Sequence, residues 1–121
     1  MTLPTGVYKT NMIFVTGPLF AGKEEFIKTA LGMDDEEFSR CAVRDVQELA
    51  CASADLEALA VELSRKRIVI ATEVGGGIVP ADERQRRERE AAGRLACLLA
   101  ARAETVIRVC CGLPQVLKGR L

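Results

Sequence analysis

The stretch VTGPLFAGKEE, residues 15–25, decides the fold that this sequence predicts. It joins a short apolar run to an amphipathic segment, which indicates a buried strand, a glycine-rich loop and then a helix. Gly17, four further residues and the pair Gly22-Lys23 have the spacing of a phosphate-binding loop. The next position of such a loop is Ser or Thr, whose hydroxyl holds magnesium, but here it is Glu24. The loop therefore either binds nucleotide in an altered way or is the remnant of one that did.

A loop of this kind can bind phosphate through its backbone and one lysine. Its glycines let the backbone turn N–H groups inward around phosphate oxygens, and the start of the helix adds partial positive charge. Lys23 would supply a mobile cation beside the transferred phosphate. The Glu24 carboxylate can ligate magnesium, although it brings negative charge close to the phosphates. The residues expected to surround a bound nucleotide here are Gly17, Pro18, Leu19, Phe20, Ala21, Gly22, Lys23 and Glu24. The alternative is a strand-to-helix turn without a ligand.

Composition restricts the class of protein. A chain of 121 residues, 49% of them hydrophobic, predicts a single domain over residues 1–121 with a real core. Seventeen basic residues balance seventeen acidic ones, so no net field favours nucleic acid or anionic lipid as a partner. The apolar runs are far shorter than a membrane span, and the N-terminus lacks the build of a signal peptide. We therefore expect a cytoplasmic protein without a membrane span.

The cysteines fit that compartment. The five cysteines form no CxxC pair, and no histidine is present to complete a zinc site. We expect reduced, mostly buried thiols, because free cysteine often behaves as a small core residue. A reactive thiol is the alternative. The five are Cys41, Cys51, Cys97, Cys110 and Cys111.

Strand and helix patterns alternate along the chain. Strands are expected at residues 11–17, 41–46, 67–73 and 104–112, and helices at residues 22–32, 53–66 and 81–103, with an acidic turn or short helix at 34–40. This order predicts an α/β protein with a three-layer, P-loop NTPase-like fold, in which helices flank a mainly parallel sheet of four or five strands. Ligands of such sheets bind beyond the carboxyl ends of the strands. Residues 17–24, 72–80 and 112–118 are expected at that edge.

The second half of the chain carries a more specific pattern. TEVGGGIVPADERQRREREAAGRL, residues 72–95, followed by ETVIRVCCGLPQVLKG, residues 104–119, resembles the C-terminal half of the bifunctional adenosylcobinamide kinase/adenosylcobinamide-phosphate guanylyltransferase family. That family reads Asn-Glu-Val-Gly-x-Gly-Ile-Val-Pro, then Arg-x-Phe-Arg-Asp and Gly-Arg-x-Asn-Gln, and finally Gly-x-Pro and Leu-Lys. The matching residues are Glu73, Val74, Gly75, Gly77, Ile78, Val79, Pro80, Arg86, Arg89, Gly93, Arg94, Gly112, Pro114, Leu117 and Lys118. Thr16, Gly17, Gly22 and Lys23 match the family's phosphate loop, Thr-Gly-Gly-x-Arg-Ser-Gly-Lys-Ser.

The resemblance implies a reaction and its site. The γ-phosphate of ATP or GTP would pass to the aminopropanol hydroxyl of adenosylcobinamide, a corrinoid of cobalamin biosynthesis. Lys23 and Glu73 are the candidate catalytic residues, and Glu24 and Asp45 the candidate ligands of Mg²⁺. Glu73 could instead tie down the glycine loop that follows it, and a plain surface position is the alternative for Asp45.

The same resemblance implies roles for one helix. Arg86 and Arg89 match family positions and lie three residues apart, so they share a helical face. They could reach phosphates or a neighbouring subunit, because family members resemble propeller-like trimers. A homo-oligomer is therefore expected. For Arg84 and Arg87, by contrast, we expect a solvated helix start with ion pairs.

The departures from the family pattern leave two functions open. Pro18, Phe20, Ala21 and Glu24 replace the family's Gly, Arg, Ser and Ser, and the middle segment, residues 32–66, is short. That segment carries the family's guanylylated histidine, and this sequence has no histidine. We therefore expect a kinase that lacks the guanylyl step. The alternative is a non-catalytic relative that binds a nucleotide, a corrinoid or only a partner, and regulates.

Overall fold

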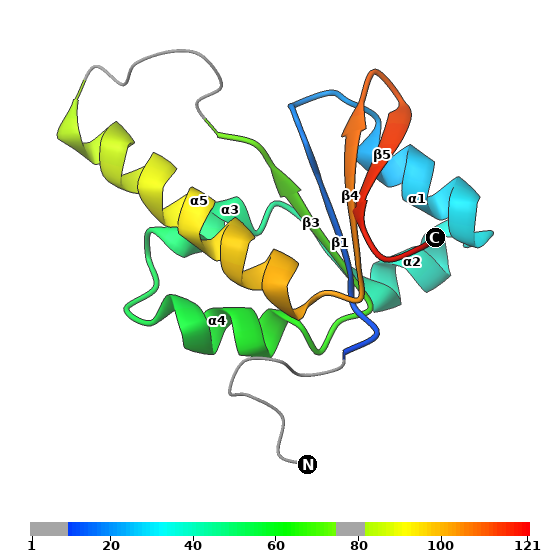
Figure 1. Cartoon of the computed structure of the whole chain (residues 1–121), viewed down its shortest axis with the longest axis horizontal. Coiled ribbons are helices and arrows are strands. Elements are labelled where there is room, and N and C mark those ends of the chain that lie inside the picture. Colours follow the sequence, from blue (N-terminus) through cyan, green and yellow to red (C-terminus); the bar gives the residue numbers. More distant parts are fainter. Residues whose placement is uncertain (1–9, 75–81) are drawn as a thin grey trace.

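The computed structural model describes residues 10–74 and 82–121 and contains five strands and five helices in these residues (Figure 1). The strands are β1 (Ile13–Gly17), β2 (Ala42–Val43), β3 (Ile68–Thr72), β4 (Thr105–Cys110) and β5 (Leu113–Lys118). The helices are α1 (Lys23–Leu31), α2 (Asp35–Cys41), α3 (Gln47–Ala50), α4 (Leu56–Leu63) and α5 (Glu83–Arg102). The predicted strands and helices are all present within these residues, and the acidic segment after α1 is a helix.

The five strands form one sheet in the order β2-β3-β1-β4-β5. β1 lies in the centre and pairs in parallel with β3 and β4, and β2 pairs in parallel with β3. β5 pairs antiparallel with β4 through a two-residue turn at Cys111 and Gly112, both with positive φ. The sheet is therefore mixed, so the prediction of a mainly parallel sheet was wrong. β5 was missed because all six of its residues are exposed and no buried apolar alternation marks it.

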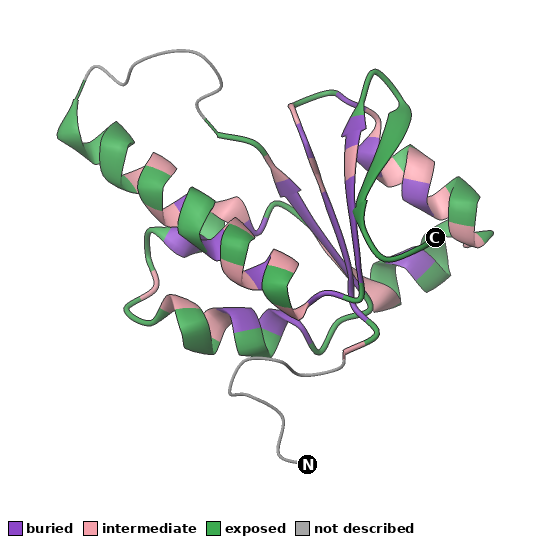
Figure 2. Cartoon of the chain, viewed as in Figure 1, coloured by how far each residue is buried: buried purple, intermediate pink, exposed green. Residues whose placement is uncertain are grey.

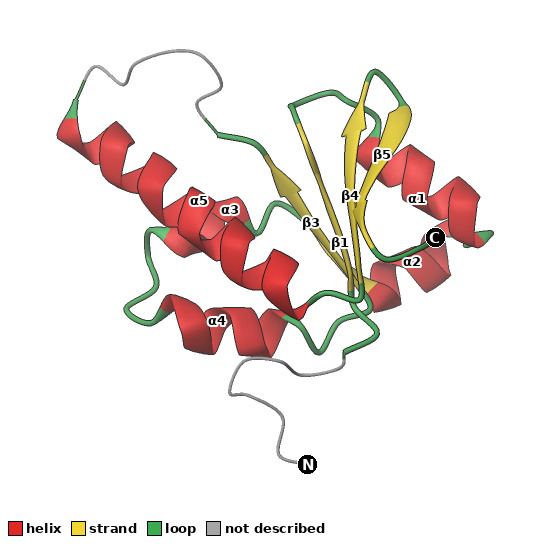
Figure 3. Ribbon diagram, viewed as in Figure 1, coloured by secondary structure: helices red, strands yellow, loops and turns green. Residues whose placement is uncertain are grey.

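Helices cover both faces of the sheet, which makes three layers (Figure 3). On one face, Phe14, Val69 and Val106 pack with residues of α3, α4 and α5. On the other face, Val15, Ile70 and Ile107 pack with Ile27 of α1 and Phe38 of α2. The alternation of side chains along each strand therefore buries both faces, as the purple strands in Figure 2 show.

Local sequence explains where the helices begin and end. Gly32, with φ of 65°, closes α1. The Asp55 carboxylate accepts a hydrogen bond from the Ala58 N–H and caps α4. Asp82 caps α5 in the same way, through the Gln85 N–H. In the described part of the chain, no helix is both long and apolar enough to cross a membrane.

The cysteines correct another expectation. All five thiols are free, as expected, but four are exposed and Cys41 is half-buried, so the prediction of mostly buried thiols was wrong. Cys110 and Cys111 lie where β4 turns into β5, at the exposed end of the hairpin. The exposed ones are Cys51, Cys97, Cys110 and Cys111.

Candidate functional site

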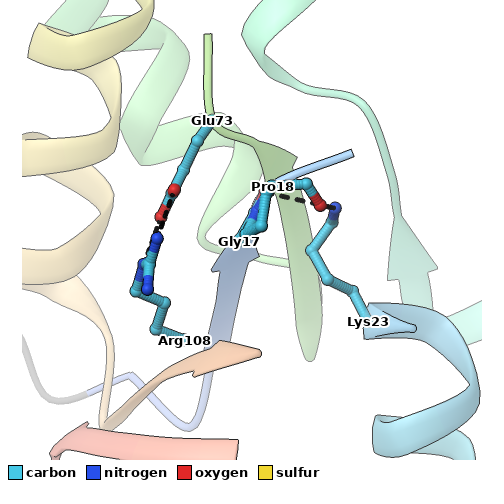
Figure 4. Close-up of polar contacts among 5 residues, drawn as sticks. All are labelled: Gly17, Pro18, Lys23, Glu73 and Arg108. Carbon is cyan, nitrogen blue, oxygen red and sulfur yellow. Dashed lines mark hydrogen bonds and ion pairs between the residues drawn. The ribbon is translucent and has the colours of Figure 1, made fainter. Parts of the chain in front are cut away.

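Gly17 ends β1 at the centre of the sheet, and its backbone contacts both Lys23 and Glu73 (Figure 4). Its φ is 152°, and a Cβ at this position would lie 2.1 Å from the backbone oxygen of Val109 in β4. No other residue type can adopt this close approach without moving a strand. The carbonyl oxygen of Gly17 accepts hydrogen bonds from Lys23 Nζ at 3.2 Å and from the Glu73 N–H at 2.9 Å.

Lys23 is the first residue of α1, and its side chain turns back onto the loop. Only 8% of the residue is exposed, and Nζ also donates to the carbonyl oxygen of Pro18 at 2.7 Å. Burial lowers the pKa of Lys23, while the negative charges of Asp45, Glu73 and Glu24 act in the opposite direction. Three carboxylates thus lie close enough to this ammonium to favour its charged form.

The loop between Gly17 and Lys23 presents apolar side chains outward. Leu19 is 65% exposed and Phe20 94% exposed, and Phe20 has a positive φ of 59°. Ala21 is buried, and its carbonyl oxygen accepts a hydrogen bond of 2.8 Å from the Gly112 N–H, so the β4–β5 turn packs against the loop. Pro18 has no N–H, so the loop has one phosphate donor fewer than a loop without proline.

A pocket of about 340 Å³ opens beside Lys23. It collects most of the predicted loop residues and brings Asp45 to them from the other side, since β2 and β1 end at the same edge of the sheet. Gly17, Pro18 and the predicted catalytic residue Glu73 are not in its lining. The carbonyl oxygens of Gly17 and Pro18 bind the Lys23 ammonium, which does line it. The lining residues are Leu19, Phe20, Ala21, Gly22, Lys23, Glu24, Glu25, Arg44, Asp45, Ile70 and Thr72.

Glu24 does not lie free in this pocket. Its Oε1 is 2.9 Å from a terminal guanidinium nitrogen of Arg44, which follows β2. The guanidinium carbon of Arg44 also lies 5.9 Å from the centroid of the Phe38 ring. Sequence reasoning missed Arg44, because no spacing along the chain pairs a residue after β2 with the first turn of α1.

The Asp45 carboxylate lines the pocket and is open to a cation. It has a positive φ of 56°, and its side chain accepts no hydrogen bond from the described residues. Among the described residues, no group of three or more His, Cys, Asp or Glu side chains could hold a metal ion. Mg²⁺ commonly binds through one or two carboxylates, with phosphate oxygens and waters completing its shell. Asp45 fits that pattern, and Glu24 fits it only if Arg44 releases its carboxylate.

Glu73, directly after β3, is bound by Arg108 of β4. The Arg108 Nε donates to Oε2 at 2.7 Å and a terminal nitrogen donates to Oε1 at 2.8 Å, and the pair passes over the end of β1 (Figure 4). The hydrogen bonds from Arg108 hold the pKa of Glu73 below its ordinary value, against a smaller opposite effect of burial. Sequence reasoning missed Arg108, which stands within an apolar strand. The alternative that Glu73 ties down the glycine loop concerns residues 75–77, which lie outside the described residues.

The structure does not bring the two helix arginines to this pocket. Arg86 is exposed on α5 and is not in the pocket lining. Arg89 is half-buried and lines a different pocket of about 950 Å³, between α5 and residues 53–57 before and within α4. The glycine-rich block after Val74, which had supported the site, lies outside the described residues.

Comparison with known proteins places the chain in a family. The profile of the family described as cobinamide kinase / cobinamide phosphate guanyltransferase matches residues 28–117. The matched region contains Arg44, Asp45, Glu73 and Arg108, and it begins after the loop at residues 15–25. A comparison with curated proteins finds no matching relative. Because the profile covers well over half of the chain, the protein belongs to the cobinamide kinase / cobinamide phosphate guanyltransferase family, a family of cobalamin biosynthesis.

Proposed function

We propose that the protein is a P-loop-type kinase that transfers the γ-phosphate of ATP or GTP to the aminopropanol hydroxyl of adenosylcobinamide. The observation that carries this proposal is the position of Lys23. Its ammonium lies at the carboxyl end of the central strand, on the wall of a pocket of about 340 Å³ that also contains Asp45. This is the edge at which open α/β sheets bind their ligands.

Phosphoryl transfer needs positioning and neutralisation of charge more than covalent chemistry. Lys23 would leave the carbonyl oxygens of Gly17 and Pro18 and meet phosphate oxygens instead, a change of partners within reach of the same side chain. The N–H groups from Leu19 onward would complete the cradle. Phosphate oxygens carry full negative charge, so they are stronger partners for an ammonium than carbonyl oxygens are.

Mg²⁺ would neutralise part of the phosphate charge when it is bound. We propose Asp45 as its first protein ligand, because that carboxylate lines the pocket without a hydrogen-bonding partner in the described residues. Glu24 would be a second ligand only if Mg²⁺ displaced Arg44 from its carboxylate. Glu73, which Arg108 keeps ionised, would accept a hydrogen bond from the acceptor hydroxyl and orient it.

The guanylyl step is absent from this proposal. The family resemblance routes that step through a histidine, and the chain contains none. A second function, that of a non-catalytic relative which binds a nucleotide, a corrinoid or a partner, has its own supporting observation. Two charged side chains of the site already have partners: Lys23 contacts two carbonyl oxygens, and Glu24 is paired with Arg44.

Two measurements separate these functions. Calorimetric titration with ATP and GTP, with and without Mg²⁺, tests whether the pocket binds nucleotide at all. Incubation with γ-labelled nucleotide and adenosylcobinamide then tests transfer, and we expect labelled adenosylcobinamide phosphate. Binding without transfer would favour the non-catalytic relative, and the absence of nucleotide binding would refute the kinase.

We also propose that the protein is a cytoplasmic homo-oligomer, a trimer by its resemblance to family members. Light scattering after gel filtration measures the mass directly. The chain has a mass of 13.1 kDa, so a particle of that mass would refute the oligomer.

A further inference from the structure

Arg44 is placed at the pocket by the sheet itself. It follows Val43 at the end of β2. Because β2 runs parallel to β3, both strands end at the same edge of the sheet. Glu24 reaches this edge from the other side of the pocket, in the first turn of α1. Arg44 and Glu24 both line the pocket together with Lys23 and Asp45.

Two contacts hold the guanidinium in place and leave donors free. One is the ion pair with Glu24 at 2.9 Å, and the other is the ring of Phe38, which is 2% exposed and therefore fixed in the core. Arginine carries five N–H donors in a planar fork, and Oε1 of Glu24 lies 2.9 Å from one of its terminal nitrogens. The Arg44 side chain is 52% exposed, so its other donors are accessible from the pocket.

The charges of the pocket show why a second cation is needed. Its lining has the cations Lys23 and Arg44 and the carboxylates of Glu24, Glu25 and Asp45. Without Arg44, a single ammonium would stand against three carboxylates, and a triphosphate would be repelled. A guanidinium meets phosphate oxygens with two parallel hydrogen bonds, which a lysine cannot do.

From this geometry we propose that Arg44 is a further binding residue of the pocket, which contacts the phosphate oxygens of the bound nucleotide, and that Glu24 positions its guanidinium. The inference rests on the proposed nucleotide binding. It also assigns a role to the carboxylate that replaces the usual hydroxyl of the loop: Glu24 takes part in the site by holding an arginine.

The test uses the full chain in metal-free buffer, with ATP and inorganic tripolyphosphate as probes in calorimetric titrations. Arg44→Gln is expected to weaken the binding of both probes about tenfold or more, since hydrogen bonds to charged groups are among the strong ones. Arg44→Lys should recover part of that loss, because it restores the charge without the fork. Arg84→Gln, which breaks an exposed ion pair with Glu88 on α5, is the matched control and should bind as the wild type does.

The double variant Glu24→Gln/Arg44→Gln distinguishes a phosphate contact from simple neutralisation of Glu24. If Arg44 contacts phosphate, the double variant stays weak; if it restores wild-type affinity, Arg44 only cancels a charge and the inference is overturned. Arg44→Gln that binds like the wild type also overturns it, while leaving the kinase standing. A wild type that binds neither probe, in metal-free buffer or with Mg²⁺, refutes both. Weakened binding by Arg44→Gln, together with a wild type that transfers no phosphate in the presence of Mg²⁺, refutes the kinase alone.

Discussion

Substitution of Gly17 by alanine tests the physical basis of the site. Gly17 has a φ of 152°, and the added Cβ would lie 2.1 Å from the Val109 backbone oxygen, where a normal contact needs more than 3 Å. The neighbour is backbone within β4, so it cannot move aside as a flexible side chain would. Either β1 and β4 separate, or the loop leaves its conformation.

The magnitude follows from two contributions. A backbone conformation reserved for glycine costs about 1–3 kcal/mol when another residue adopts it. Forcing extra volume into a packed region costs a further ~1–3 kcal/mol. We therefore expect Gly17→Ala to lower the free energy of unfolding by about 2–6 kcal/mol, a large part of the ~5–15 kcal/mol that a folded domain possesses.

Urea denaturation followed by circular dichroism measures this loss. With a slope of about 1–3 kcal/mol per molar urea, the midpoint should fall by roughly 2 M. Gly93→Ala is the matched control, because Gly93 lies within α5 and its added Cβ would meet nothing within 4 Å. That change should stabilise the protein by about 0.5–1 kcal/mol. If Gly17→Ala and Gly93→Ala have the same midpoint, the argument from close strand approach is wrong.

Three further predictions concern Lys23, the pair of Glu73 with Arg108, and the guanylyl step. Lys23→Met should abolish ATP binding in calorimetric titration while the thermal midpoint changes little, because the lost ammonium was partly desolvated; retained binding would exclude Lys23 from the site. Arg108 holds the pKa of Glu73 below its ordinary value of 4.5, so the pair stabilises the fold above that pH, and its contribution disappears as the pH falls through the lowered pKa. Urea midpoints measured from pH 7 to pH 3 should therefore decline less steeply in Arg108→Gln than in the wild type, and equal slopes would contradict this linkage. Incubation with labelled GTP should leave no covalent guanylyl group on the denatured protein, because no histidine is present to accept one.

The sequence by itself determined the local parts of this protein. The apolar run before Gly17, the glycine spacing of the loop and the apolar stripe of the next segment predicted β1, the loop and α1, and all three are present. The alternation of strands and helices also predicted that residues 17–24 and 72–80 would meet at one edge of the sheet, and Lys23 and Thr72 do line one pocket. Residues 112–118 were expected at the same edge, but Leu113–Lys118 runs back along β4 as the antiparallel strand β5. The predictions that succeed depend on periodicity and turn chemistry within a few residues.

Only the tertiary structure decided how the charges of the site are paired. The partner of Glu24 follows β2, and the partner of Glu73 lies in β4, so each pair depends on the order of strands in the sheet. The antiparallel β5 likewise depends on pairing with β4, since its own residues are all exposed and carry no signal of burial. An ion pair between distant elements leaves no period or spacing in the sequence, because its geometry exists only after β1 has taken its place between β3 and β4.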